Sequence, residues 1–196
     1  MNVEQLNNPK TELYNQFKNL VLSGNFPWFW VDDTLGLDKT SDTIDSYPHL
    51  TEEQRASGKF GTFGMFHNQF LLRPGTPDQQ TQSRLFYPLP TGDDTKGINQ
   101  LLCEIFQFNK IKLNVIYRIG INNVPPQKKI ISSLPHFDHD FPHKNLIIYF
   151  TNAGGKTYVK DKSFDPKEDD IISFDGLHWC DTPEKKNRIV LVATYL

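Results

Sequence analysis

The sequence predicts a mainly β protein of the α+β class, and three observations carry this prediction. Short runs rich in β-branched and aromatic residues recur in the C-terminal half, where Gly, Pro and Asp separate them. Phe and Tyr are frequent, with 15 and 7 copies, which suits packed strands better than a helical bundle. Apolar residues fall at helical spacing only in the N-terminal half. The 196 residues suffice for one core and no linker is evident, so we expect a single domain, 1–196.

The N-terminal part, residues 1–110, is expected to mix helices and strands. In chain order we expect a helix at 9–23, a strand at 26–31, a loop at 32–60 with a short helix at 51–57, a strand at 60–73, a loop at 74–84 and a helix at 97–109. The aromatic run Trp28, Phe29 and Trp30 is expected to pack in the core under the sheet.

The C-terminal part, residues 111–196, is expected to be all β. The predicted strands lie at 111–119, 144–152, 156–159, 170–174 and 188–196. Strands at this spacing, without long helices between them, predict a sandwich or a barrel. The segment 120–135, with two consecutive prolines, is expected to be a loop, and we hypothesise that it is a lid over the site.

Composition excludes several classes of protein. The formal net charge is -2, so no global field favours nucleic acid or an anionic membrane. The two cysteines, Cys103 and Cys180, are far apart and form no CxxC pair, which argues against a zinc ribbon and a disulfide scaffold. The N-terminus has no signal-peptide apolar region, and no apolar run is long enough to span a bilayer. We therefore expect a cytoplasmic protein.

The stretch PHFDHDFPHK, residues 135–144, concentrates possible metal ligands. Its prolines make it a poor helix, so it is expected to be extended. In an extended segment residues two apart point to the same side, so His136 and Asp138 can bind one ion while His139 points away. A hairpin can bring His178 back to the same place. Two histidines and one carboxylate form the facial triad of non-haem Fe(II) enzymes.

The remaining histidines and acids of this region are expected to play other roles. His139, Asp140 and His143 are expected to face solvent or the substrate. His49 and His67 are expected to be structural or exposed. The zinc-protease motif HExxH is absent, and it requires a helix.

Further residues lie where such a site needs them. Gly154 and Gly155 allow a tight turn with unusual backbone dihedrals. Arg188 follows His178 by ten residues and begins a predicted strand, where a buried guanidinium can bind a carboxylate.

The ordered pattern of HFD at 136–138, GGKT at 154–157, His178 and Arg188 resembles the Fe(II)/2-oxoglutarate-dependent oxygenase superfamily. The resemblance is greatest to its prolyl-hydroxylase-like branch, including the small bacterial and phage-type members. It covers the chain from about Lys112 onward and is looser before that. Many animal prolyl hydroxylases carry Lys in place of Arg188, and Arg fulfils the same electrostatic role.

The resemblance implies a double-stranded β-helix, or jelly roll, with N-terminal helices packed outside. It implies Fe(II) bound by His136, Asp138 and His178, with O2 and 2-oxoglutarate as co-reactants. It also implies a set of cosubstrate contacts: Arg188 for the distal carboxylate, with Thr157, Tyr149 and Tyr117 or Asn114 as helpers. No catalytic side chain is expected beyond the metal centre.

The activity implied is that of a dioxygenase that hydroxylates a C–H bond and decarboxylates 2-oxoglutarate to succinate. Related halogenases lack the carboxylate that Asp138 supplies here, so hydroxylation is favoured over halogenation. A protein, peptide or small molecule is the expected substrate, and a prolyl residue is the best single guess.

Three alternatives stay open at this point. An oxidative nucleic-acid demethylase of the same superfamily usually carries a second arginine soon after the first, but position 194 is Thr. A non-catalytic jelly-roll binding protein would retain the ligands as vestiges. A cupin-type metal enzyme would require an HxH pair, whereas residues 136–138 are His-Phe-Asp.

Overall fold

The computed structural model describes residues 3–32, 46–71 and 92–196, and in this part of the chain the protein is mainly β, as predicted. The helices are α1 (Glu12–Leu22), α3 (Glu52–Ala56) and α5 (Gly92–Phe108). The Thr11 hydroxyl caps α1 by accepting a hydrogen bond from the Tyr14 N–H at 3.2 Å. Thr51 and Gln54 form a reciprocal capping box at the start of α3.

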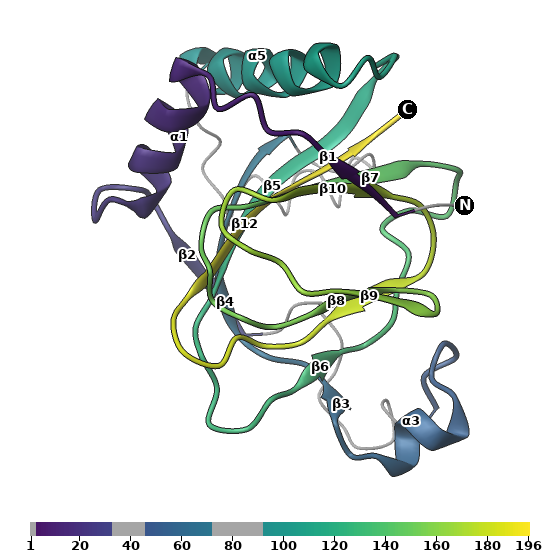
Figure 1. Ribbon diagram of the computed structural model, residues 1–196. Helices are drawn as coiled ribbons and strands as arrows, with labels where there is room; N and C mark the ends of the chain where they lie inside the picture. The colour runs from purple at the N-terminus through teal and green to yellow at the C-terminus, as the bar shows by residue number, and fades with distance from the viewer. Residues whose placement is uncertain (1–2, 33–45, 72–91) are drawn as a thin grey trace.

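The larger sheet is antiparallel throughout, and strands distant in sequence are neighbours in it. In spatial order its strands are β1 (Glu4–Leu6), β10 (Ile171–Phe174), β7 (Lys144–Tyr149), β12 (Arg188–Tyr195), β5 (Ile116–Val124), β4 (Met65–Leu71) and β2 (Phe29–Val31). The C-terminal strand β12 therefore lies between β7 and β5 at the centre of the sheet (Figure 1).

The smaller sheets lie on the other side of the molecule from α1 and α5 (Figure 1). One three-stranded antiparallel sheet has the order β11 (His178–Cys180), β8 (Thr157–Val159), β9 (Lys162–Phe164). The short strands β3 (Phe60–Gly61) and β6 (Ser132–Ser133) pair in parallel. Single backbone bridges join the β6 segment to β11, at Ser132 with Asp181 and at His136 with His178.

Alternate residues of the larger sheet bury two different faces. Along β7, Leu146 and Ile148 belong to the core that includes apolar side chains of α1 and α5, so the helices cover this face (Figure 1). Ile147 and Tyr149 belong instead to a second cluster that also includes Val159 of β8. The second face is therefore directed at the smaller sheet.

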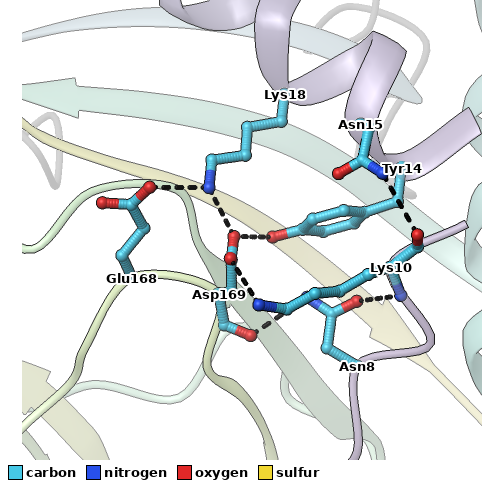
Figure 2. Close-up of polar contacts among 7 residues, drawn as sticks. All are labelled: Asn8, Lys10, Tyr14, Asn15, Lys18, Glu168 and Asp169. Atoms are coloured by element: carbon cyan, nitrogen blue, oxygen red, sulfur yellow. Dashed lines mark hydrogen bonds and ion pairs between the residues drawn. The ribbon is translucent and has the colours of Figure 1, made fainter. Parts of the chain in front are cut away.

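A polar cluster fastens α1 to the turn before β10 (Figure 2). Asp169, which has a positive φ of 71°, accepts hydrogen bonds from the Tyr14 hydroxyl at 2.7 Å and from Lys18 at 2.6 Å. Lys10 lies 2.9 Å from its other carboxylate oxygen. Partial burial raises the pKa of Asp169, but the hydrogen bonds from these donors outweigh it and lower the pKa to about 2.

Most of the predicted elements correspond to elements of the structure, with the following corrections. The strand expected at 111–119 runs instead over 116–124, so the expected loop at 120–135 begins later. It continues through Gly120 and its polar neighbours because β4 and β12 supply hydrogen-bond partners on both sides. Trp30 is 51% exposed rather than in the core, because β2 is an edge strand. The short strands β1, β6, β9 and β11 were not expected from the sequence, and β6 lies within the loop expected at 120–135.

Other expectations fall on parts of the chain that are not described. The loop predicted at 74–84 and most of the one at 32–60 lie outside the described residues. Within the described residues, none of the helices combines the length and the apolar character needed to cross a membrane.

Candidate metal centre

The structure brings His136, Asp138 and His178 together. Their ligand atoms lie within 4.8 Å of one another, and this is the only such group of three or more among the described residues. The backbone holds the segments in register, since the N–H of each of the two histidines donates to the carbonyl of the other at 3.0 Å. A single antiparallel bridge, rather than the hairpin expected from the sequence, brings β11 beside the segment that follows β6, because β7 to β10 lie between the two segments in the chain.

The orientation of the two imidazoles suits metal binding. His136 Nδ1 lies 2.9 Å from the Leu134 carbonyl, and His178 Nδ1 lies 3.1 Å from the Gly176 carbonyl. A carbonyl only accepts, so Nδ1 of each ring carries the proton and Nε2 keeps its lone pair. Both rings therefore present an Nε2 acceptor toward the shared space.

The pKa of His178 also favours a ligand role. Burial lowers its pKa below the usual 6.5, although the neighbouring Asp138 carboxylate partly offsets this. A lowered pKa keeps the imidazole neutral at neutral pH, which is the form that binds metals.

Asp138 is held by a residue that the sequence did not reveal. Its Oδ1 accepts a hydrogen bond from Arg118 Nη1 at 2.8 Å, and its Oδ2 lies 3.4 Å from His178 Nε2. Arg118 lies on β5, 20 residues before Asp138. The one available signal was a charged residue within an otherwise apolar strand pattern.

Next to this group lies a cavity of about 110 Å³ between the two sheets. The three candidate ligands line it together with Arg188 of β12 and Thr157 of β8. Apolar side chains such as Val190 cover much of the remaining wall. The cavity is therefore small, largely apolar and bounded by charged groups.

Arg188 is buried, with 4% exposed, and its polar partners are neutral. Its Nη2 donates to Thr157 Oγ1 at 2.8 Å and its Nη1 to the Asp181 carbonyl at 3.3 Å, while the Tyr149 ring lies 5.4 Å from its guanidinium carbon. Among the described residues no carboxylate lies within ion-pair distance of it. Because a buried charge requires compensation, the cavity suits an anionic ligand.

The pKa values around Arg188 keep its neighbours in defined states. Burial alone would lower the pKa of Arg188, but Cys180 and Tyr149 beside it raise the value, so the guanidinium stays charged. Burial raises the pKa of Tyr149, which keeps the phenol protonated. The Tyr149 hydroxyl lies 2.7 Å from Thr157 Oγ1, so the three side chains form one network.

The two glycines shape the turn that leads into β8. Gly154 and Gly155 have φ values of +74° and +82°, a region that other residues rarely adopt. A Cβ at Gly155 would lie 2.7 Å from the Asp181 carbonyl oxygen, so a side chain there would displace the backbone beside Arg188.

Two of the expected cosubstrate contacts lie elsewhere. Tyr117 packs against Phe141 and His139, with ring centroids 5.0 and 6.1 Å apart, and it does not line the cavity. Asn114 is exposed, and its N–H pairs with the carbonyl of Leu196 at 2.6 Å. The structure therefore supports Thr157 and Tyr149 rather than these two as neighbours of Arg188.

The other histidines are placed as follows. His139 Nε2 bonds to Thr194 Oγ1 at 2.9 Å, and the ring is half-buried. His143 was expected to face solvent or the substrate; only 8% of it is exposed, and it lines the second groove described below. His67 is also buried and pairs with Asn122 at 2.6 Å, whereas His49 is exposed beside Phe137.

A second, open groove of about 840 Å³ begins on the other side of His136. Its walls carry the exposed Phe137, together with Tyr47, Phe141 and Pro142. Phe137 lies between the two ligands of the HxD segment and points to the opposite side, as the alternation of an extended chain requires. The groove and the cavity therefore share one wall at His136.

Comparison with known proteins gives likeness in structure alone. No protein-family model matches the chain, and no curated protein matches its sequence. Several solved structures resemble it, and among them are members of the superfamily that the sequence resembles.

Three of these structures illustrate the extent of the likeness. A 2OG-Fe(II) oxygenase family oxidoreductase from Burkholderia pseudomallei has a TM-score of 0.43 at 12% identity, over 96% of this chain and 92% of that one. A viral collagen prolyl hydroxylase from Paramecium Bursaria Chlorella virus-1 has 0.43 at 14%, over 85% and 93%. A prolyl hydroxylase from Trichoplax adhaerens has 0.40 at 11%, over 96% and 94%. At these values the likeness carries no argument about function, which therefore rests on the side chains described above.

Proposed function

We propose that the protein is an Fe(II)- and 2-oxoglutarate-dependent dioxygenase that hydroxylates a C–H bond. The observation that carries the proposal is a small cavity between two sheets that is lined both by His136, Asp138 and His178 and by the buried Arg188, which has no carboxylate partner among the described residues. In this proposal the two sheets form the double-stranded β-helix that the sequence resemblance implies.

The donor set fits iron better than the common structural metals. Two imidazoles and one carboxylate form a facial triad that leaves coordination positions open, whereas structural zinc sites are closed by four protein ligands. The Nδ1–H bonds to Leu134 and Gly176 fix both rings in the ligating tautomer. Iron held here would supply the activation of O2, coupled to oxidative decarboxylation of 2-oxoglutarate to succinate.

The part of the cavity wall formed by Arg188 suits the distal carboxylate of 2-oxoglutarate. Arg188 provides a charged donor, and Thr157 and Tyr149 add hydroxyls beside it. The apolar side chains between Arg188 and the ligands exclude water and suit the methylene groups of such a molecule. These residues would orient the cosubstrate so that its other end reaches the metal.

The substrate would enter from the groove that adjoins His136. Its aromatic walls and its position beside the ligands suit an extended peptide, and aromatic-lined grooves favour proline-rich segments in particular. A prolyl residue of a protein or peptide is therefore the proposed target. A nucleic-acid demethylase would carry its second arginine at position 194. Here Thr194 is buried and bonded to His139, which argues against the demethylase alternative.

Succinate formation tests the proposed reaction. Purified protein would be incubated with Fe(II), 2-oxoglutarate and a proline-rich peptide, and succinate and the peptide mass would be measured. Peptide-dependent succinate with a gain of one oxygen in the peptide is the expected result. Turnover that appears only with other substrates would refute the prolyl target, and an absence of succinate with every substrate class would refute the reaction.

A further inference from the structure

The ion pair between Arg118 and Asp138 is buried beside the candidate ligands. Only 8% of Arg118 and 6% of Asp138 are exposed, and Nη1 lies 2.8 Å from Oδ1. In so dry an environment a charge-assisted hydrogen bond is strong and directional. The carboxylate is therefore held in one orientation before any metal arrives.

The strand that carries Arg118 has a glycine, Gly120, beside it. A Cβ built on Gly120 would lie 3.2 Å from His67 Cε1, which is a tight approach, and 3.7 Å from Arg118 Nη2, which is an ordinary van der Waals contact. Gly120 faces the same side of β5 as Arg118, two residues away. Arg118 pairs with Thr194 of β12 in the register of the larger sheet, which fixes its position along the strand.

The two carboxylate oxygens of Asp138 have different neighbours. Oδ1 accepts from Arg118, while Oδ2 lies 3.4 Å from His178 Nε2 and thus faces the other ligand atoms. A carboxylate that bound through both oxygens would occupy one of the positions that the cosubstrate and O2 require at a facial triad.

We propose that Arg118 is a positioning residue that holds Asp138 as a one-oxygen ligand and so preserves an open coordination position. This inference rests on the proposed function, because it concerns the same metal centre. Arg118 acts through Asp138 and does not itself bind the metal.

Metal titration without cosubstrate tests this role directly. Mn(II) binding would be followed by the loss of the free-ion EPR signal in wild type, Arg118→Met and Arg118→Lys. Removal of the partner of a ligating group typically weakens metal binding about 10- to 100-fold, and this range is expected for Arg118→Met. Co(II)-loaded Arg118→Met should show weaker, shifted d–d absorption bands, since a released carboxylate can bind through both oxygens.

The lysine variant separates charge from geometry and guards against misfolding. It keeps the buried positive charge but lacks the planar fork, so it should fold and recover only part of the affinity. Arg55→Met is the control, because it truncates an arginine that lies outside the cavity and donates to the Tyr47 carbonyl rather than to a candidate ligand. Its Mn(II) affinity should equal that of the wild type.

The outcomes are distinguishable. Mn(II) binding by Arg118→Met as tight as in wild type, or full recovery in Arg118→Lys, would overturn the positioning role. A wild-type protein that takes up no Mn(II) would overturn the proposed metal centre itself, and this inference with it.

Discussion

Two buried arginines, Arg118 and Arg188, line one cavity, and they differ in whether a carboxylate accompanies their charge. Arg118 faces the Asp138 carboxylate at 2.8 Å, so its charge is compensated within the chain. Arg188 donates to the Thr157 hydroxyl and a backbone carbonyl and meets no carboxylate in the described part of the chain, so its charge is not compensated there. Burial of a charge is costly unless an opposite charge accompanies it. Arg118 therefore interacts with the protein's own carboxylate, whereas the charge of Arg188 is left for the proposed anionic ligand to compensate.

The largest expected effect follows from removal of the carboxylate at the compensated end. Asp138→Asn removes the charged ligand and leaves Arg118 buried without its counter-charge. We expect Mn(II) binding to become undetectable and the free energy of unfolding to fall by about 3–5 kcal/mol. Metal titration and urea denaturation measure the two effects. Asp140→Asn, an exposed neighbour, is the control and should change neither; equal effects in both variants would contradict the account.

Arg188→Met should produce the opposite combination. Loss of the uncompensated charge should weaken 2-oxoglutarate binding about 100-fold, equivalent to roughly 3 kcal/mol for a desolvated charge pair. The free energy of unfolding should stay the same or rise, because a buried unpaired charge is replaced by an apolar side chain. Anaerobic titration and urea denaturation report on the two quantities. Unchanged 2-oxoglutarate affinity together with lost stability would assign Arg188 a structural role instead.

A smaller effect is expected from Thr157→Val, which keeps the side-chain shape and removes the hydroxyl. Arg188 and Tyr149 both lose a partner, at a cost of about 1–2 kcal/mol in stability. The affinity for 2-oxoglutarate should fall about 10-fold, which corresponds to ~1.4 kcal/mol. Tyr149→Phe, which removes the other hydroxyl, is the matched variant. Mn(II) affinity should be unchanged in both variants. Weaker Mn(II) binding in either variant would contradict the assignment of these hydroxyls to the cosubstrate.

The smallest effect on the site is expected from the cluster at Asp169, which lies outside the cavity (Figure 2). Asp169→Asn should lower the free energy of unfolding at neutral pH by about 1–3 kcal/mol through the loss of charged hydrogen bonds, while Mn(II) and 2-oxoglutarate affinities stay the same.

The pH dependence of this cluster follows from its pKa. The pKa of Asp169 is about 2 in the folded protein against a usual 3.8, so its contribution is complete above the usual value and disappears as the pH falls through about 2. Wild type and Asp169→Asn should therefore converge in stability at the acid end of a pH series of thermal melts. A difference that persists unchanged at the lowest pH would contradict this assignment.

Much of the fold could be predicted from local sequence. Strands with alternating or continuous β-favouring residues, such as β7 and β12, were located closely, because their pattern is set by burial on both faces. The end of β5 was not, since Asn122 and Asn123 look like turn residues until neighbouring strands supply their partners. Trp30 was assigned to the core because aromatic character alone does not distinguish an edge strand from a central one.

The residues of the site also differ in how far local sequence could predict them. His136 and Asp138 are two residues apart, so the alternation of an extended chain sufficed to place them on one side. Arg118 depends on a contact across 20 residues, and His67 on one across 55, and neither separation leaves a periodic trace. Tertiary pairing therefore determined what sequence pattern did not.

The proposed function requires one cavity to bind both Fe(II) and the distal carboxylate of 2-oxoglutarate. An anaerobic titration of Fe(II) and 2-oxoglutarate into wild type, His136→Ala and Arg188→Ala tests it most directly, with the visible metal-to-ligand charge-transfer band as the readout. The account predicts a band in wild type, none in His136→Ala, and a band in Arg188→Ala only at much higher 2-oxoglutarate. A wild-type protein without the band, or a band of equal strength in all three proteins, would contradict it.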